Sequence, residues 1–168
     1  TNEKRFPRVN ASNMENYLAG EKSDLFVMNT LSPFFEETWK ADAKAFAELM
    51  KRIKKVDKNH TVVMMQVENE AGAANVAIDQ QPGAEELFNE SVPKQLIQYL
   101  IKHKNEIVPA LSKAWAECGN KAEGTWREVF GSISIDAFMA WHYASFMEHV
   151  TAAGKAEYNI PMYYNAWI

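Results

Sequence analysis

Residues 61–72 read TVVMMQVENEAG, and this stretch determines which fold the sequence predicts. It begins with a β-branched and methionine-rich run, Thr61 to Val67, that is apolar on both alternating faces, as is typical of a strand buried on both sides of a parallel sheet. Glu68, Asn69 and Glu70 follow at the carboxyl end of that strand, where active sites of α/β proteins collect. Because neighbouring side chains of a strand point to opposite faces, Asn69 and Glu70 can both face one ligand only if the strand twists or bulges at its end.

A long amphipathic helix is predicted before this strand. Ser32 offers an N-cap oxygen and Pro33 suits the first helical position, so we expect a helix from there to about Val56. Its apolar stripe repeats every 3.6 residues and comprises Ala41, Ala45, Phe46, Leu49, Met50, Ile53 and Val56. Residues 57–60 form a turn, and residues 1–31 read as an irregular segment with a short strand near Leu25 to Met28. A helix followed by a buried strand is a unit of a parallel α/β sheet.

A long helical insertion is predicted after Glu70. Turn residues at 79–83 indicate that the chain leaves the sheet after Glu70. A segment outside the sheet then runs to about residue 133. Apolar periodicity predicts helices near 84–90, 93–104 and 108–118. Thr125 and Glu128 have the spacing of a capping box for a short helix, Trp126 to Phe130, that stops at Gly131.

A second helix and strand pair closes the sequence. Ser134 is predicted to cap a helix from Ile135 to Ala153 that ends at Gly154, with its apolar face toward the sheet. That face comprises Ile135, Met139, Tyr143, Phe146 and Val150. Pro161 then opens a second buried strand over 162–167. The end of this strand carries Tyr164, Asn165 and Trp167, for which contact with a ligand and packing in the core are equally open interpretations.

Composition and charge narrow the class of partner. The 168 residues are 47% apolar and 24% charged, as expected of one folded domain, and the net charge of −4 argues against a nucleic-acid surface. No apolar run has the roughly 20 residues of a membrane-spanning helix. The four histidines and the single cysteine show no metal-ligand spacing, and there is no glycine-rich phosphate loop, so no metal or cofactor is implied. A neutral or weakly polar ligand fits best.

The chemistry centres on Glu70. A carboxylic acid at the mouth of a buried strand can have its pKa raised by burial and can then protonate a leaving oxygen. Spacing alone, however, favours the plainer interpretation that Glu68, Asn69 and Glu70 are the polar lip where a strand meets solvent. Residues 66–72, QVENEAG, resemble the strand-four motif of glycoside hydrolase family 35, the β-galactosidases, which are retaining hydrolases built on (β/α)8 barrels.

The resemblance covers most of the chain. Further segments that look like the bacterial branch of the family are KRFPRV at 4–9, LSPF at 31–34, GTW at 124–126, MAWHY at 139–143 and PMYYNAW at 161–167. It implies a partial (β/α)8 TIM barrel from about strand four to strand five, with the helical insertion after strand four. A whole barrel takes roughly 250 residues, and the chain starts without Met and stops inside an apolar run, so we expect residues 1–168 to be an incomplete catalytic domain truncated at both ends.

The resemblance also implies roles for individual residues. Glu70 matches the general acid/base, and Asn69 matches the residue that hydrogen-bonds the sugar 2-hydroxyl. The family nucleophile is a second Glu at the end of strand seven, beyond what this chain covers, so residues 1–168 alone are expected to be inactive. The remaining acids considered, Glu117, Asp136, Glu148 and Glu157, fall on helices or their flanks.

The implied activity is that of an exo-β-galactosidase acting on oligosaccharides or plant polysaccharide side chains, with a secreted or periplasmic location. Two alternatives remain open. One is another retaining barrel hydrolase of the β-glucosidase or mannanase type, since Asn-Glu at strand four is shared among them. The other is a carbohydrate-binding barrel that does not catalyse. A carbohydrate is the partner in each case.

Overall fold

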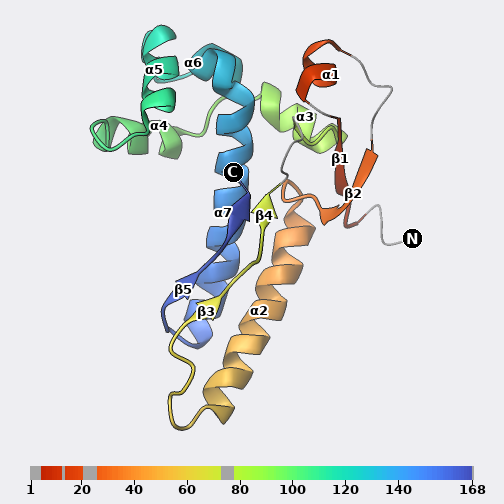
Figure 1. Ribbon diagram of the computed structural model, residues 1–168, viewed down its shortest axis with the longest axis vertical. Helices are drawn as coiled ribbons and strands as arrows, with labels where there is room; N and C mark the ends of the chain where they lie inside the picture. The colour runs from red at the N-terminus through yellow and green to blue at the C-terminus, as the bar shows by residue number, and fades with distance from the viewer. Residues whose placement is uncertain (1–4, 13, 21–25, 73–77, 168) are drawn as a thin grey trace.

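The computed structural model describes residues 5–12, 14–20, 26–72 and 78–167. In the first part of the chain the elements are β1 (Arg8–Ala11), α1 (Met14–Leu18), β2 (Phe26–Leu31), α2 (Glu36–Val56), β3 (Met65–Gln66) and β4 (Ala71–Gly72). The second part contains α3 (Pro82–Asn89), α4 (Lys94–Lys102), α5 (Pro109–Glu117), α6 (Trp126–Phe130), a 3₁₀ turn (Gly131–Ile133), α7 (Ser134–Glu157), β5 (Met162–Tyr163) and β6 (Ala166–Trp167). Figure 1 shows the two long helices, α2 and α7, side by side with the β3–β6 strands along them.

The contact between α2 and α7 is the main packing of the molecule. Phe46 and Met50 of α2 are buried against Met147 and Val150 of α7, and Val67 joins the same cluster from the strand side. Gly154, predicted to end α7, instead lies buried inside the helix, which continues to Glu157. A Cβ at this position would overlap the Phe46 ring, so the glycine serves close helix packing and not termination.

Two parallel strand segments run along the helices. β3 pairs with β5 and β4 pairs with β6, both in parallel, with α7 lying between the two strands in sequence. Parallel strands joined through a helix are the unit from which (β/α)8 barrels are built. The sheets among the described residues are two-stranded and none closes into a barrel, so the partial barrel stays a prediction.

The prediction that 61–67 is a strand buried on both faces is wrong. Val63 and Met64 are 71% and 53% exposed, and residues 61–64 lie outside the ladder. The physical reason is a local competitor for the backbone: the Asp57 carboxylate accepts hydrogen bonds from the Thr61 and Val62 N–H groups at 2.8 and 2.9 Å. The second strand is not fully buried either, since Tyr163 and Tyr164 are about half exposed.

The insertion folds as predicted. α3, α4 and α5 fall within a few residues of the predicted helices, and Thr125 and Glu128 form the predicted capping box of α6. A second core gathers around Trp126, Phe130 and Phe138, all 1% exposed or less. The capping box and the periodic apolar faces are local signals, which is why the sequence predicts them well.

Two predicted helix caps are absent. α2 begins at Glu36 with Phe35 as its N-cap, because Ser32 is buried and its N–H donates to the Pro7 carbonyl at 2.8 Å. Ser134 does not cap α7, since the 3₁₀ turn runs straight into the helix and the Ser134 N–H donates to the Gly131 carbonyl.

The antiparallel pair β1–β2 was only partly predicted. β2 overlaps the strand expected near 25–28, but β1 was not predicted, because residues 1–31 lack a clear hydrophobic period. After β4 and the undescribed residues 73–77, the chain returns along β1. The Gln80 N–H donates to the Asn10 carbonyl, and the Gln81 side chain donates to the Arg8 carbonyl.

Among the residues that the structure describes, no helix combines the length and the apolar character needed to cross a membrane.

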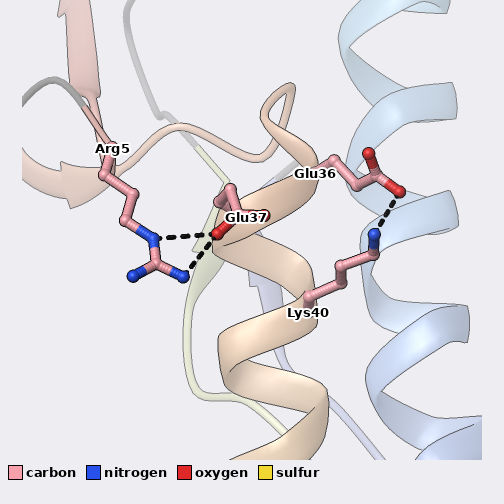
Figure 2. Close-up of polar contacts among 4 residues, drawn as sticks. All are labelled: Arg5, Glu36, Glu37 and Lys40. Atoms are coloured by element: carbon pink, nitrogen blue, oxygen red, sulfur yellow. Dashed lines mark hydrogen bonds and ion pairs between the residues drawn. The ribbon is translucent and has the colours of Figure 1, made fainter.

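Exposed ion pairs lie at the start of α2. Figure 2 shows Arg5, from the segment before β1, reaching Glu37 on the first turn of α2, while Lys40 pairs with Glu36 on another side of the helix. The Arg5 Nη2 lies 2.7 Å and the Arg5 Nε 2.9 Å from Glu37 Oε2. These pairs are exposed and each contributes little.

Candidate functional site

A two-residue bulge interrupts the first parallel strand at Glu68, Asn69 and Glu70. Between the pairs Gln66–Tyr163 and Ala71–Ala166, this strand advances five residues while its partner advances three. The Asn165 backbone bridges the gap, because its N–H donates to the Glu68 carbonyl at 3.3 Å and its carbonyl accepts from the Ala71 N–H at 3.0 Å. The bulge that would let Asn69 and Glu70 face the same ligand is therefore present.

The bulge is built with an unusual backbone conformation. Glu70 has a φ of +54°, in the left-handed region that non-glycine residues rarely adopt. Such conformations cost energy and persist where the surrounding structure imposes them. Here the ladder resumes at once on the far side, at Ala71, so the strand pairing holds Glu70 in this state.

The three polar residues of the bulge border one pocket. Glu68, Asn69 and Glu70 all line a cavity of about 260 Å³, so the two residues predicted to share a ligand do share a pocket. The opposite walls come from Thr38 and Asp42 on α2 and from Tyr143 and Phe146 on α7. The remaining lining residues are Thr30, Leu31, Pro33, Ala71 and Gly72. The cavity is slightly smaller than the roughly 300 Å³ at which ligand pockets begin.

Asn69 is oriented by its neighbour Gln66. The Gln66 side-chain amide donates to Asn69 Oδ1 at 2.9 Å and to the Glu68 carbonyl at 3.2 Å. This engages the oxygen of the Asn69 amide and leaves its NH₂ group as the donor that a ligand oxygen can use. Glu70 itself is exposed, so the predicted burial of this carboxyl group is wrong for the described structure.

Two further carboxyl groups of the pocket are perturbed. Burial raises the pKa of Glu68, and the nearby Asp42 charge raises it further. Burial also raises the pKa of Asp42. Each of these acids therefore holds its proton to a higher pH than an exposed carboxyl group does.

The pocket also carries buried hydroxyl groups without partners. Thr38 is 2% exposed, and neither its Oγ1 nor the Tyr143 hydroxyl has a hydrogen-bond partner among the described residues. Burial, helped by the Asp79 charge, raises the pKa of Tyr143 above its ordinary value, so the phenol stays protonated. Buried polar atoms are nearly always satisfied in native proteins, so these two hydroxyl groups are exceptions.

The three residues predicted at the end of the second strand have different surroundings. Tyr164 lines a smaller cavity of about 40 Å³ that shares Ala71 and Tyr143 with the main pocket. Asn165 is exposed and contributes its backbone to the bulge. The side chain of Trp167 lies outside the described part of the structure.

Sequence reasoning missed Thr38 and Asp42 and gave Tyr143 a packing role alone. A signal for the first two was available, because residues 38, 42, 46 and 50 lie four apart and form one face of α2. The face is apolar at Phe46 and Met50 and polar toward the start of the helix, where the strand ends lie. Tyr143 was predicted, but only as part of the apolar face of α7.

The other polar candidates do not form a site. His142 is packed against the rings of Phe34 and Phe138, and burial lowers its pKa to about 4. Within the described ranges, no group of three or more His, Cys, Asp and Glu side chains could hold a metal ion. Compared with known proteins, the chain matches no family model and no curated protein sequence.

Proposed function

We propose that residues 1–168 supply the acid/base half of a retaining β-glycosidase, with an exo-β-galactosidase as the particular activity. One observation carries the proposal: a two-residue bulge at the end of a parallel strand places Asn69 and Glu70 in the same pocket. The resemblance of residues 66–72 to the family 35 motif supplies the reaction.

In the proposed reaction, Glu70 gives its proton to the glycosidic oxygen as the bond from that oxygen to the anomeric carbon breaks. A second carboxylate attacks the anomeric carbon and forms a glycosyl ester. Glu70, now ionised, then takes a proton from the water that hydrolyses this ester. Asn69 donates its amide N–H to the sugar 2-hydroxyl oxygen.

The second carboxylate is proposed to lie outside residues 1–168. Retaining enzymes hold their two carboxyl groups about 5 to 5.5 Å apart, and the nucleophile must be ionised. Asp42 and Glu68 share the pocket with Glu70, but neither has the position of the family nucleophile, which follows a later strand of the barrel. A Glu at the end of a further buried strand, about two strand–helix units after Ile168, is what the proposal requires.

Removing the acid tests the proposal in the full-length gene product. Glu70→Ala should lower kcat/KM about 10²- to 10⁴-fold on a galactoside with a poor leaving group, and much less on an aryl galactoside whose leaving group needs no proton. Exposed Glu86 on α3 lies outside the pocket, and Glu86→Ala serves as the matched control.

Equal losses on both substrates would remove Glu70 from the acid role. Sugar binding without turnover in the wild-type protein would favour the non-catalytic carbohydrate-binding alternative. Faster cleavage of glucosides or mannosides than of galactosides would favour the β-glucosidase or mannanase type.

A further inference from the structure

The Gln66 side chain makes two hydrogen bonds across the bulge. Gln66 is the last paired residue of β3, opposite Tyr163, and it is not among the described residues that line the pocket. Its Nε2 atom lies 3.2 Å from the Glu68 carbonyl oxygen and 2.9 Å from Asn69 Oδ1. A side-chain amide has two N–H donors, one for each of these acceptors. One side chain thus joins the strand before the bulge to two residues inside it.

The Glu68 carbonyl determines the orientation of both side-chain amides. A backbone carbonyl accepts hydrogen bonds and never donates them, so the Gln66 atom that faces it must be the nitrogen. The same nitrogen donates to Asn69, so the Asn69 atom that faces it must be the oxygen. With its oxygen held on the side of Gln66, the Asn69 amide presents its NH₂ group on the opposite side.

The carbonyl that sets this orientation is itself held in place. The Asn165 N–H, from the partner strand, donates to the Glu68 carbonyl at 3.3 Å, and Gln66 is the second donor. A carbonyl oxygen has two lone pairs, so both are in use. The orientation of Asn69 is therefore anchored in the backbone of the strand pair.

An asparagine with a fixed orientation is selective for the ligand atom opposite it. A side-chain amide that is free to turn offers either its oxygen or its NH₂ group, as the ligand requires. If Asn69 turned by half a revolution, its NH₂ group would face that of Gln66 and the bond between them would be lost. Since Asn69 lines the pocket, the ligand atom beside it must accept a hydrogen bond.

We propose that Gln66 is a positioning residue that fixes Asn69 as a hydrogen-bond donor and thereby makes the pocket selective for a ligand with an acceptor atom at this point. In the proposed reaction the acceptor is the sugar 2-hydroxyl oxygen. That identification rests on the proposed function, whereas the orientation of Asn69 rests on the hydrogen bonds of Gln66. Gln66 acts through Asn69 and does not touch the sugar.

The first test measures the orientation without a substrate. In the full-length protein labelled with ¹⁵N in its side-chain amides, the signals of Gln66 and Asn69 are those lost in Gln66→Met and Asn69→Ala. Both Gln66 amide protons are hydrogen-bonded, so they should exchange with water about fivefold more slowly than those of exposed Gln98 on α4. The Asn69 amide protons should exchange as fast as those of Gln98. Equally fast exchange in Gln66 and Gln98 overturns the proposal.

The second test measures selectivity in the full-length protein. The quantity is the ratio of kcat/KM on an aryl β-galactoside to kcat/KM on its 2-deoxy analogue, which lacks the acceptor. Gln66→Met keeps the length of the side chain and removes its donors, so the Asn69 amide can turn and is correctly oriented for only part of the time. The ratio should fall about two- to fivefold. A merely structural role would lower kcat/KM on both substrates equally and leave the ratio unchanged.

A double variant shows whether Gln66 acts through Asn69. Asn69→Ala alone should lower the same ratio, and adding Gln66→Met to it should lower the ratio no further, because the amide to be oriented is already gone. A further fall in the double variant overturns the positioning role. Gln98→Met, at an exposed site on α4 outside the pocket, is the matched control and should leave the ratio unchanged.

The outcomes separate this proposal from the proposed function. If no galactoside is hydrolysed, the proposed function fails, and the exchange rates of the Gln66 amide protons still decide whether Gln66 orients Asn69. If galactosides are hydrolysed and Gln66→Met leaves the substrate ratio unchanged, the proposed function stands and the positioning role is overturned. The exchange rates are measured on the unmodified protein, so they hold even where Gln66→Met lowers its stability.

Discussion

Asp57 shows how one side chain can decide the course of the backbone. Its carboxylate accepts hydrogen bonds from the Thr61 N–H, the Val62 N–H and the Thr61 hydroxyl, the last at 2.7 Å. Short polar side chains of this kind compete with strand ladders for backbone groups. The turn that joins α2 to β3 is therefore fixed by Asp57, and residues 61–64 stay outside the strand, which begins at Met65.

This carboxylate makes stability depend on pH. The hydrogen bonds from Thr61 and Val62 lower the pKa of Asp57 below its ordinary value. A group whose pKa is lower in the folded state contributes stability that is complete above its unfolded pKa and is lost as the pH falls through its folded pKa. We expect the melting temperature to drop in acid, below the ordinary range of an aspartate.

Asp57→Asn checks this expectation, because the amide keeps one acceptor oxygen and cannot ionise. The variant should be less stable at neutral pH and should lose part of the acid-dependent fall in melting temperature. An unchanged pH profile would show that Asp57 does not contribute to it.

At the scale of the elements, the helix bounds and caps that depend on local sequence patterns were predicted correctly. The bounds of the insertion helices, the capping box at Thr125 and the end of α2 at Val56 follow from periodicity and capping. The cap at Ser32 and the helix end at Gly154 were wrong, because a distant carbonyl at Pro7 and a distant ring at Phe46 determine what these residues do.

In the candidate site, too, the residues with a local signal were predicted and those that depend on distant contacts were missed. Asn69 and Glu70 were found because a motif at a strand end is a local signal. Thr38 and Asp42 were missed because their importance depends on α2 packing beside the bulge, a contact between segments about thirty residues apart. A sequence read alone does not report which polar residues of a helix meet a strand end.

The helix contact at Gly154 predicts a measurable loss of stability. Gly154→Ala adds a methyl group that overlaps the Phe46 ring, and overpacking of this kind costs about 1 to 3 kcal/mol. Ala is the better helix former by about 1 kcal/mol, so the net loss should be smaller than the overlap alone implies. Chemical denaturation of the full-length protein measures it.

The control is a second substitution that makes room. Phe46→Leu shortens the opposing side chain, so the double variant should be more stable than the sum of the two single changes predicts. Strict additivity would mean that Gly154 and Phe46 do not contact each other in solution.

At the scale of the whole molecule, large apolar side chains lie exposed beside the parallel strands. Val63 and Met64, just before β3, and Tyr163 and Tyr164, at the end of β5, are between 47% and 71% exposed, and they border two-stranded sheets. Exposed apolar segments beside free strand edges pair with other chains and aggregate. The helices α2 and α7 cover the strands around Val67.

We expect the isolated 168-residue chain to self-associate. Light scattering should show particles larger than the monomer that grow with concentration, and thermal unfolding should lack one cooperative transition. Val63→Lys with Met64→Lys should reduce the association, since charge on exposed strand positions prevents edge pairing. Lysine substitutions at exposed Ala110 and Ser132, in the insertion, are the matched control. A monomer with a sharp transition in the unmodified chain would contradict the expectation.

The bulge at Glu68 to Glu70 also has a meaning for chain length. The ladder before and after it runs in the same parallel sense, so a chain shorter by two residues here could pair Gln66 and Ala71 with the same partners without interruption. Strand pairing alone gives no reason to keep the extra residues. The strand pairing does not need these two residues. A deletion of two residues at this point is expected to abolish the pocket and to leave the rest of the molecule folded.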